Sequence, residues 1–183
     1  MKNSIFQSAL ILFSTVTIIS CNKDNSKDAS PLPQPIIENN WKLNEYNFSR
    51  STSYQNSTTY TNGNPFTQVN VDSKISNDNG SFKTCNVVFW FNTSTDGIYK
   101  AKSVDTMLNS VKLKYMNIKC MVSNAAGAGA IYESVNTNIA VTVKKVNNKF
   151  VITASEPITL NKTLDDGLVN APTSMTFTCD NLR

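Results

Sequence analysis

The chain has 183 residues, with 17 lysine and arginine residues against 13 aspartate and glutamate residues and a formal net charge of +4. Its basic residues are scattered along the sequence, which argues against a nucleic-acid partner. The sequence contains no histidine. This excludes Ser-His-Asp and Cys-His nucleophile systems and histidine metal ligands, so we expect neither a cofactor nor a metal site.

The N-terminus carries one positive charge, at Lys2, and continues as a mostly apolar run from Ile5 to Ile19. A bilayer-spanning helix needs about 20 apolar residues, and this run is shorter. A basic start followed by an apolar region of this length is typical of a secretory signal peptide, which we expect over residues 1–20.

The apolar run ends at Ile18-Ile19-Ser20-Cys21, which resembles the lipobox of bacterial lipoproteins. The resemblance implies cleavage between Ser20 and Cys21 by signal peptidase II and attachment of a diacylglyceryl group to the Cys21 thiol. Each buried CH₂ of an acyl chain contributes about 0.8 kcal/mol, so two or three chains hold a protein firmly at a bilayer. We therefore expect the membrane to be a partner of this chain through Cys21.

The residues after Cys21 refine the expected location. Lipoproteins of many Gram-negative cells stay in the inner membrane when aspartate follows the lipidated cysteine, and here Asn22 stands at that position. This favours the outer membrane. Asn22-Lys23-Asp24 is also similar to the short export tag of Bacteroidota-type lipoproteins, and that similarity implies display on the cell surface.

Residues 21–40 are expected to form a flexible tether that begins at the lipidated cysteine. The segment is polar, lacks apolar periodicity, and carries prolines at positions 31, 33 and 35. Such a composition buries too little surface to offset the entropy of the chain, and its proline-rich part should be extended. With its lipobox, polar tether and β-rich remainder, the chain resembles small lipoproteins of the Bacteroidota type.

Residues 41–183 form one expected domain, in which two-residue turn signals separate stretches of period two. Asparagine and glycine accept the positive φ that tight hairpin turns require. The one helical turn that we expect covers residues 104–110. The turn signals are Asn62-Gly63, Asn79-Gly80, Asp96-Gly97 and Asn147-Asn148, and the strand-like stretches are 51–61, 66–75, 81–91, 98–104, 139–146 and 149–155.

Alternation along these stretches predicts which side chains face the core, because residues two apart in a strand point the same way. The pattern predicts an all-β fold, an antiparallel β-sandwich of about ten short strands. The alternative is a lipocalin-like up-and-down barrel. The expected core sets are Cys85, Val87, Phe89 and Phe91; Met116, Ile118, Cys120 and Val122; Ile139, Val141 and Val143; and Met175, Phe177 and Cys179.

The three cysteines that remain after Cys21 all fall on these expected core faces. We expect Cys85, Cys120 and Cys179 to pack as small apolar groups, with one disulfide between neighbouring strands as the alternative. The carboxylates are sparse, and Asp165-Asp166-Gly167 is typical of a turn. A glycan-acting enzyme would need two carboxylates that converge, such as Glu133 with Glu156.

Trp90 carries the binding hypothesis. It lies on the outward side of its strand between Asn86 and Asn92, and an indole flanked by amides is a platform for a sugar ring or a partner side chain. The alternative is that Trp90 is a buried structural residue. Separately, Asp105-Thr106-Met107 matches the acceptor pattern of O-glycosylation in lipoproteins of this type, with Thr106 as the modified residue.

Taken together, these patterns predict a lipid-anchored protein of the outer membrane or cell surface whose β-domain binds a glycan or protein without catalysis. We expect no catalytic residues. A lipocalin-like carrier of an apolar ligand and a glycan-acting enzyme are the alternatives. An empty apolar cavity of several hundred Å³ would favour the carrier, and a filled core would favour the binding domain.

Overall fold

The computed structural model describes residues 39–59, 63–75 and 82–183. The signal peptide, Ser20, Cys21, most of the tether and the Asn79-Gly80 turn lie outside these residues. The described residues belong to one compact unit, Ile37–Arg183. Within them, no helix has the length and apolar character that crossing a membrane requires.

The all-β prediction is confirmed, and the described residues form ten strands and one short helix. These elements are β1 (Asn40–Leu43), β2 (Tyr46–Thr59), β3 (Pro65–Ser73), β4 (Thr84–Asn92), β5 (Gly97–Ala101), α1 (Val104–Leu108), β6 (Tyr115–Ser123), β7 (Gly129–Ser134), β8 (Ala140–Val146), β9 (Lys149–Asp166) and β10 (Ser174–Leu182).

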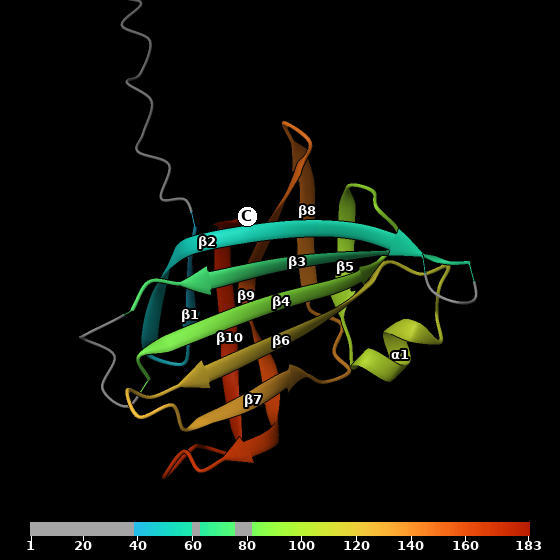
Figure 1. The fold of residues 1–183 in the computed structure, drawn as a ribbon. Helices are drawn as coiled ribbons and strands as arrows, with labels where there is room; N and C mark the ends of the chain where they lie inside the picture. The colour runs from blue at the N-terminus through green and yellow to red at the C-terminus, as the bar shows by residue number, and fades with distance from the viewer. Residues whose placement is uncertain (1–38, 60–62, 76–81) are drawn as a thin grey trace, which may run out of the picture. The chain divides into compact units, whose positions relative to one another are not determined.

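The strands form two layers that pack face to face. The first layer holds β2, β3, β4, β6 and β7, and the second holds β1, β5, β8, β9 and β10, whose strands run across those of the first (Figure 1). Hydrogen bonds join the layers into one continuous sheet, because β2 pairs with both β1 and β3, and β9 pairs with β7, β8 and β10. The arrangement is that of a β-sandwich whose two sheets are continuous.

Two details of the sequence prediction need correction. The strands are not all short, since β2 has 14 residues and β9 has 18, and each of them pairs in both layers. The sheet is also not wholly antiparallel, because β5 pairs parallel to β6 through Lys100↔Tyr115 and Ala101↔Met116. The crossover through α1 makes this parallel pair. Because β4 pairs with β6 and β7 pairs with β9, the strand order is not that of an up-and-down barrel.

The expected core faces lie between the two layers. All the members of the four predicted sets are buried except Ile139, which is partly buried and packs against the core. Aromatic rings meet across the layers: Phe89 on β4 lies 5.9 Å from Phe177 on β10, and Phe91 on β4 lies 5.4 Å from Phe150 on β9. These contacts occupy part of the space between the layers, where a carrier would hold its ligand.

The predicted helical turn is present as α1, between β5 and β6. Ser103 caps its N-terminus by accepting a hydrogen bond from the Thr106 backbone N–H at 3.4 Å, and Met107 is buried beneath it. The Asn147-Asn148 turn is also confirmed: it joins β8 to β9, with φ of 50° and 62°. Both angles are positive, as a two-residue type I′ turn requires.

Candidate functional site

Trp90 lies near the middle of the outward side of the first layer. It sits on β4, where it pairs with Gln68 on β3 and with Asn117 on β6. Its neighbours along the strand, Phe89 and Phe91, point into the core. The strand pleat therefore turns the Trp90 side chain away from the core, as the sequence predicts.

Two side chains hold the indole of Trp90 in place. The ring of Phe66 meets it at 5.9 Å with an interplanar angle of 72°, and the Lys119 ammonium lies 5.0 Å above its ring. Lys119 in turn forms an ion pair with Glu133 Oε1 at 2.8 Å. The indole is partly buried, and the ammonium covers one face of it.

Asn86 lies on the same side of β4 as Trp90, four positions before it in the sequence. Its Nδ2 donates to Asp72 Oδ1 at 2.6 Å, and Thr52 Oγ1 donates to the other carboxylate oxygen of Asp72 at 3.0 Å. Asp72 thus ties β2, β3 and β4 together on the outward side. The remaining amide oxygen of Asn86 is buried and has no hydrogen-bond partner.

Asn92 is the third residue of the predicted site, but its side chain contacts the segment around α1 and not the residues around Asn86. It is 2% exposed, and its Nδ2 donates to the carbonyl oxygens of Met107, Ser110 and Leu113 at 2.8, 3.0 and 3.4 Å. These carbonyls belong to α1 and the segment that follows it. The amide of Asn92 therefore anchors that segment to the end of β4, and the structure does not place this amide with the Asn86 amide and the Trp90 indole.

Four buried side-chain atoms without a hydrogen-bond partner gather on this side of the sheet. They are Asn70 Nδ2, Asn86 Oδ1, Trp90 Nε1 and Asn117 Oδ1, and among the described residues only one further atom of this kind occurs, Asn39 Oδ1. Leaving a buried polar atom unpaired costs about 1–3 kcal/mol, so most such atoms in folded proteins are paired. A cluster of four on one face therefore needs an explanation.

We call this surface the Trp90 face. It consists of the outward side chains of neighbouring strands β3, β4 and β6, namely Phe66, Gln68, Asn70, Asn86, Val88, Trp90, Asn117 and Lys119. Sequence reasoning missed Asn70 and Asn117. Alternation alone marks both residues as outward-facing, but only the pairing of strands distant in sequence brings them beside Trp90.

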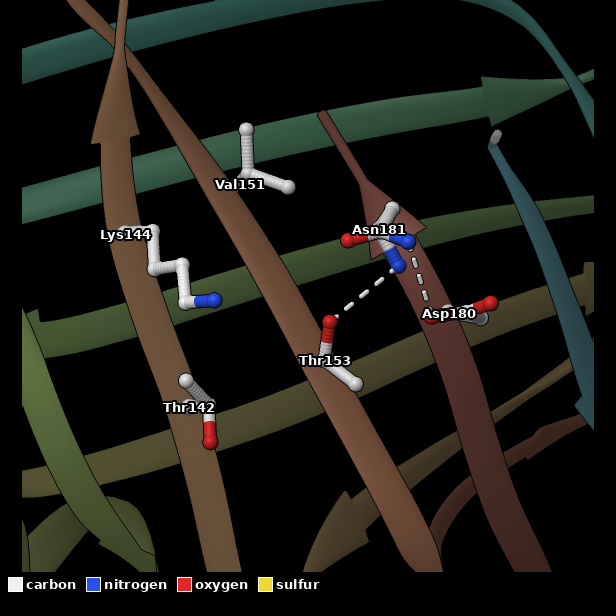
Figure 2. Close-up of a pocket in the computed structure, with 6 residues that line it drawn as sticks. All are labelled: Thr142, Lys144, Val151, Thr153, Asp180 and Asn181. Carbon is white, nitrogen blue, oxygen red and sulfur yellow. Dashed lines mark hydrogen bonds between the residues drawn. The ribbon is translucent and has the colours of Figure 1, made fainter. Parts of the chain in front are cut away.

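A second candidate lies on the outward side of the other layer. Figure 2 shows this β8–β10 pocket, in which Lys144 of β8 and Asp180 of β10 face the same hollow. Its volume is about 260 Å³, below the usual 300–1,000 Å³ of small-molecule sites. Its residues are Thr142, Lys144, Val151, Thr153, Asp180 and Asn181.

The β8–β10 pocket forms where the pairing of β10 with β9 shifts register between Cys179 and Leu182. Asn181 sits in this irregularity with φ of 46°, and its backbone N–H donates to Thr153 Oγ1 at 3.2 Å. The Asn181 side chain donates to Asp180 Oδ1 at 3.0 Å. These two hydrogen bonds engage polar groups of Thr153, Asp180 and Asn181 that line the pocket. The pocket is therefore the weaker of the two candidates.

Glu133 and Glu156, the example of paired carboxylates, lie apart. Glu133 is paired with Lys119 and stands opposite Asn161 of β9, whereas Glu156 is exposed five positions earlier on that strand. At about 3.3 Å per residue, that separation is on the order of 16 Å, well beyond the 5–10 Å of paired glycosidase carboxylates.

The Asp165-Asp166-Gly167 sequence ends β9, as the turn prediction requires, with Gly167 at φ of 73°. A hydrogen bond from Lys162 at 2.7 Å lowers the pKa of the Asp165 carboxyl. This carboxyl also accepts from the backbone N–H of Leu168 at 3.2 Å. Asp165 therefore stabilises the turn through contacts on both sides of Gly167.

The three cysteines are buried and free, so the structure contains no disulfide between Cys85, Cys120 and Cys179. Burial raises the pKa of Cys120 well above its ordinary value and raises the pKa of Cys179 to about 12. A reactive cysteine requires the opposite shift and an accessible sulfur. These thiols belong to the core.

Thr106 lies in the first turn of α1 and is partly buried. Its hydroxyl oxygen accepts a hydrogen bond from Ser103 Oγ at 3.0 Å. Cys21, the expected lipidation site, lies outside the described residues.

No protein-family model matches the chain, and neither a curated protein nor a solved structure matches it. Its function must therefore be inferred from its own sequence motifs and geometry. The Trp90 face offers the stronger geometric evidence of the two candidate sites.

Proposed function

We propose that the protein is a lipid-anchored lipoprotein of the outer membrane whose β-domain binds a ligand or partner through the Trp90 face, without catalysis. The observation that carries the binding role is the cluster of four unpartnered buried polar atoms around Trp90. A bound molecule that supplies the missing hydrogen bonds removes a cost that the unbound protein bears. Proteins retain such local costs where function requires them.

The non-catalytic part of the proposal rests on the chemistry of the side chains. The sequence has no histidine, the three thiols described above are buried, and Glu133 and Glu156 lie far apart. Ring contacts between Phe89, Phe91 and the second layer fill the interior. These features favour binding at the surface over chemistry in a cleft or carriage of a ligand inside the fold.

The anchor rests on the similarity of Ile18-Ile19-Ser20-Cys21 to a lipobox. Asn22 after the cysteine supports the outer membrane, and Asn22-Lys23-Asp24 supports the cell surface. The polar tether of residues 21–40 would let the Trp90 face reach ligands that lie away from the lipid surface. Anchor, tether and binding face together make a membrane-held receptor for an extracytoplasmic ligand.

The anchor is tested by growing cells that express the protein in radioactive palmitate. We expect the label on the wild-type protein and on a Cys179→Ala variant, and none on Cys21→Ala. The Cys179 variant is the matched control, because it also loses one sulfur. A labelled Cys21→Ala protein, or an unlabelled wild type, would refute lipid attachment at this residue. Protease treatment of intact cells then tests surface display.

The binding role is tested by cross-linking from the Trp90 face. Tyr54 lies on β2 directly opposite Asn70 and is 58% exposed, so a Tyr54→Cys variant accepts a benzophenone maleimide. The label should be selective, because the three native core thiols are buried. Irradiation in an envelope fraction should capture a partner from this position. The same label at Ile98→Cys, on β5 of the other layer and 65% exposed, is the control and should capture none.

A further inference from the structure

The unpartnered atoms of the Trp90 face form two donor–acceptor pairs. In the first pair, Trp90 Nε1 is a donor and Asn117 Oδ1 is an acceptor, and the two residues stand directly opposite each other on β4 and β6. Directly opposite residues in an antiparallel pair have Cβ atoms about 4.5–5.5 Å apart. Asn117 is 0% exposed and no hydrogen bond joins these two atoms in the structure, so a third group would have to enter between the strands' side chains to satisfy both.

The second pair consists of Asn70 Nδ2, a donor on β3, and Asn86 Oδ1, an acceptor on β4. Asn70 pairs with Val88, so Asn86 is its diagonal neighbour on the same side of the sheet. The hydrogen bond from Asn86 Nδ2 to Asp72 fixes which end of the Asn86 amide remains unpartnered. Both pairs therefore offer one N–H and one amide oxygen.

We infer that the Trp90 face binds a neutral carbohydrate, an inference that rests on the proposed function and names its ligand class. A hydroxyl group accepts one hydrogen bond and donates another, so one hydroxyl satisfies each donor–acceptor pair. All four atoms belong to uncharged amide and indole groups. Of the charged side chains beside them, Lys119 and Glu133 are ion-paired with each other, and the Asp72 carboxylate accepts hydrogen bonds from Asn86 and Thr52. The unpartnered atoms themselves therefore offer only uncharged donors and acceptors to a ligand.

The spacing of the two pairs indicates an oligosaccharide. Asn86 and Trp90 are four residues apart on β4, a distance on the order of 13 Å along an extended strand. A single sugar ring is too short to place hydroxyls at both pairs. The site therefore extends along β4, with one sugar over Trp90 and another toward Asn86.

Lys119 closes the site in the absence of a ligand. Its ammonium lies over the indole, where a sugar ring would stack through its C–H face, and its ion pair with Glu133 is partly exposed. Displacing the Lys119 side chain breaks this ion pair and the contact of the ammonium with the indole, and the stacked sugar ring replaces the second of these. This movement uncovers the face of the ring over which the ammonium lies, and Phe66 keeps the indole in position.

Affinity electrophoresis tests this inference with the full lipoprotein, in a detergent that has no sugar headgroup. The gels contain dextran, α-mannan, xylan or β-glucan as neutral probes, and polygalacturonate or heparin as charged probes. We expect at least one neutral polysaccharide to retard the protein, and Trp90→Ala to weaken this retardation at least tenfold. Lys144→Ala, in the β8–β10 pocket, is the matched control and should be retarded like the wild type.

A second variant separates a binding role from a structural one. Asn70 is 4% exposed, and Asn70→Leu replaces its unpartnered amide by an apolar group of similar size. Removing an unpaired buried polar group should leave the midpoint of thermal unfolding unchanged or raise it. The loss of one hydrogen bond to the sugar should weaken retardation by about threefold to tenfold. A residue with only a structural role would not lower affinity without lowering stability.

Three results would overturn the carbohydrate inference. The first is that no neutral polysaccharide retards the wild type while Tyr54→Cys cross-links to a protein; this result leaves the proposed binding function intact. The second is that neither retardation nor cross-linking occurs, and this refutes both. The third is equal retardation of Trp90→Ala and the wild type, which would mean that ordered water satisfies the four atoms and that the sugar binds elsewhere.

Discussion

The indole N–H of Trp41 donates a hydrogen bond to the sulfur of Cys85 at 3.3 Å. Trp41 lies on β1 in the second layer and Cys85 lies on β4 in the first, so this contact joins the two layers through the core. Trp41 is 1% exposed and also stacks on Phe48 at 5.7 Å. The first residue of the expected domain is thus one of the central residues of its core.

We expect Trp41→Phe to lower the free energy of unfolding by about 1–3 kcal/mol, because it leaves a void and removes the donor to Cys85. Urea unfolding followed by circular dichroism measures the change. Trp90→Phe is the matched control, since it is the same substitution at a partly exposed position and should cost less. Equal losses at the two positions would contradict the central role of Trp41.

The core thiols predict how stability depends on pH. The pKa of Cys179 is about 12 in the folded protein, above the ordinary value of 9.0, because its thiol is buried. The neutral thiol thus favours the folded state, and this contribution is complete below pH 9 and is lost as the pH rises toward 12. We expect the urea midpoint to fall between pH 9 and pH 10.5 under reducing conditions, and to fall less in Cys179→Ala.

The same thiols should be unreactive in the folded protein. At pH 8, Ellman's reagent should detect no thiol in a Cys21→Ala variant until urea is added, and three afterwards. If only one thiol appeared on unfolding, a disulfide would join the other two. If the reagent detected a thiol before urea is added, one of the cysteines would be accessible, in conflict with the burial of all three.

Asn92 provides a test of a structural polar residue. Its amide holds three carbonyl oxygens of the segment around α1, so Asn92→Ala should lower the free energy of unfolding by about 2–3 kcal/mol. Asn56→Ala, at an exposed position of β2, is the control and should change it by less than about 0.5 kcal/mol. If Asn92→Ala left the free energy of unfolding unchanged, these hydrogen bonds would contribute little to stability.

The sequence predicts the core of this fold better than its surface. Alternation assigns Cys85, Val87, Phe89 and Phe91 to the inside because burying one face of a strand requires a strict period of two. The Asn147-Asn148 turn is equally local, since asparagine tolerates the positive φ that the turn requires. Both features depend only on residues that are close in the chain.

What the sequence does not predict depends on residues that are distant in the chain. The lengths of β2 and β9 follow from pairing in both layers, and the parallel contact of β5 with β6 follows from the path through α1. The same applies to the site. Trp90 is identifiable as outward-facing, but its partner Asn117 becomes visible only when β4 and β6 are paired.

Phe89 on β4 and Phe177 on β10 decide between a binding domain and a carrier, because their rings meet across the layers at 5.9 Å. A carrier needs space there, and these rings occupy part of it. We therefore expect the wild type to leave the emission of a fluorescent fatty acid unchanged at micromolar concentrations. Saturable enhancement by the wild type would contradict the filled interior and support carriage of an apolar ligand.

A substitution at Phe89 supplies the positive control for that measurement. Phe89→Ala removes a fully buried ring and should lower the free energy of unfolding by about 3–5 kcal/mol. Cavities of this kind lined by apolar side chains stay dry and accept small apolar molecules, so the variant should bind benzene where the wild type does not. Ile98→Ala, which shortens an exposed side chain of β5, is the control: it should neither lower the free energy of unfolding by this amount nor bind benzene. A variant that binds no benzene would show that the layers close over the void, since only a rigid interior keeps the volume that the ring of Phe89 occupied.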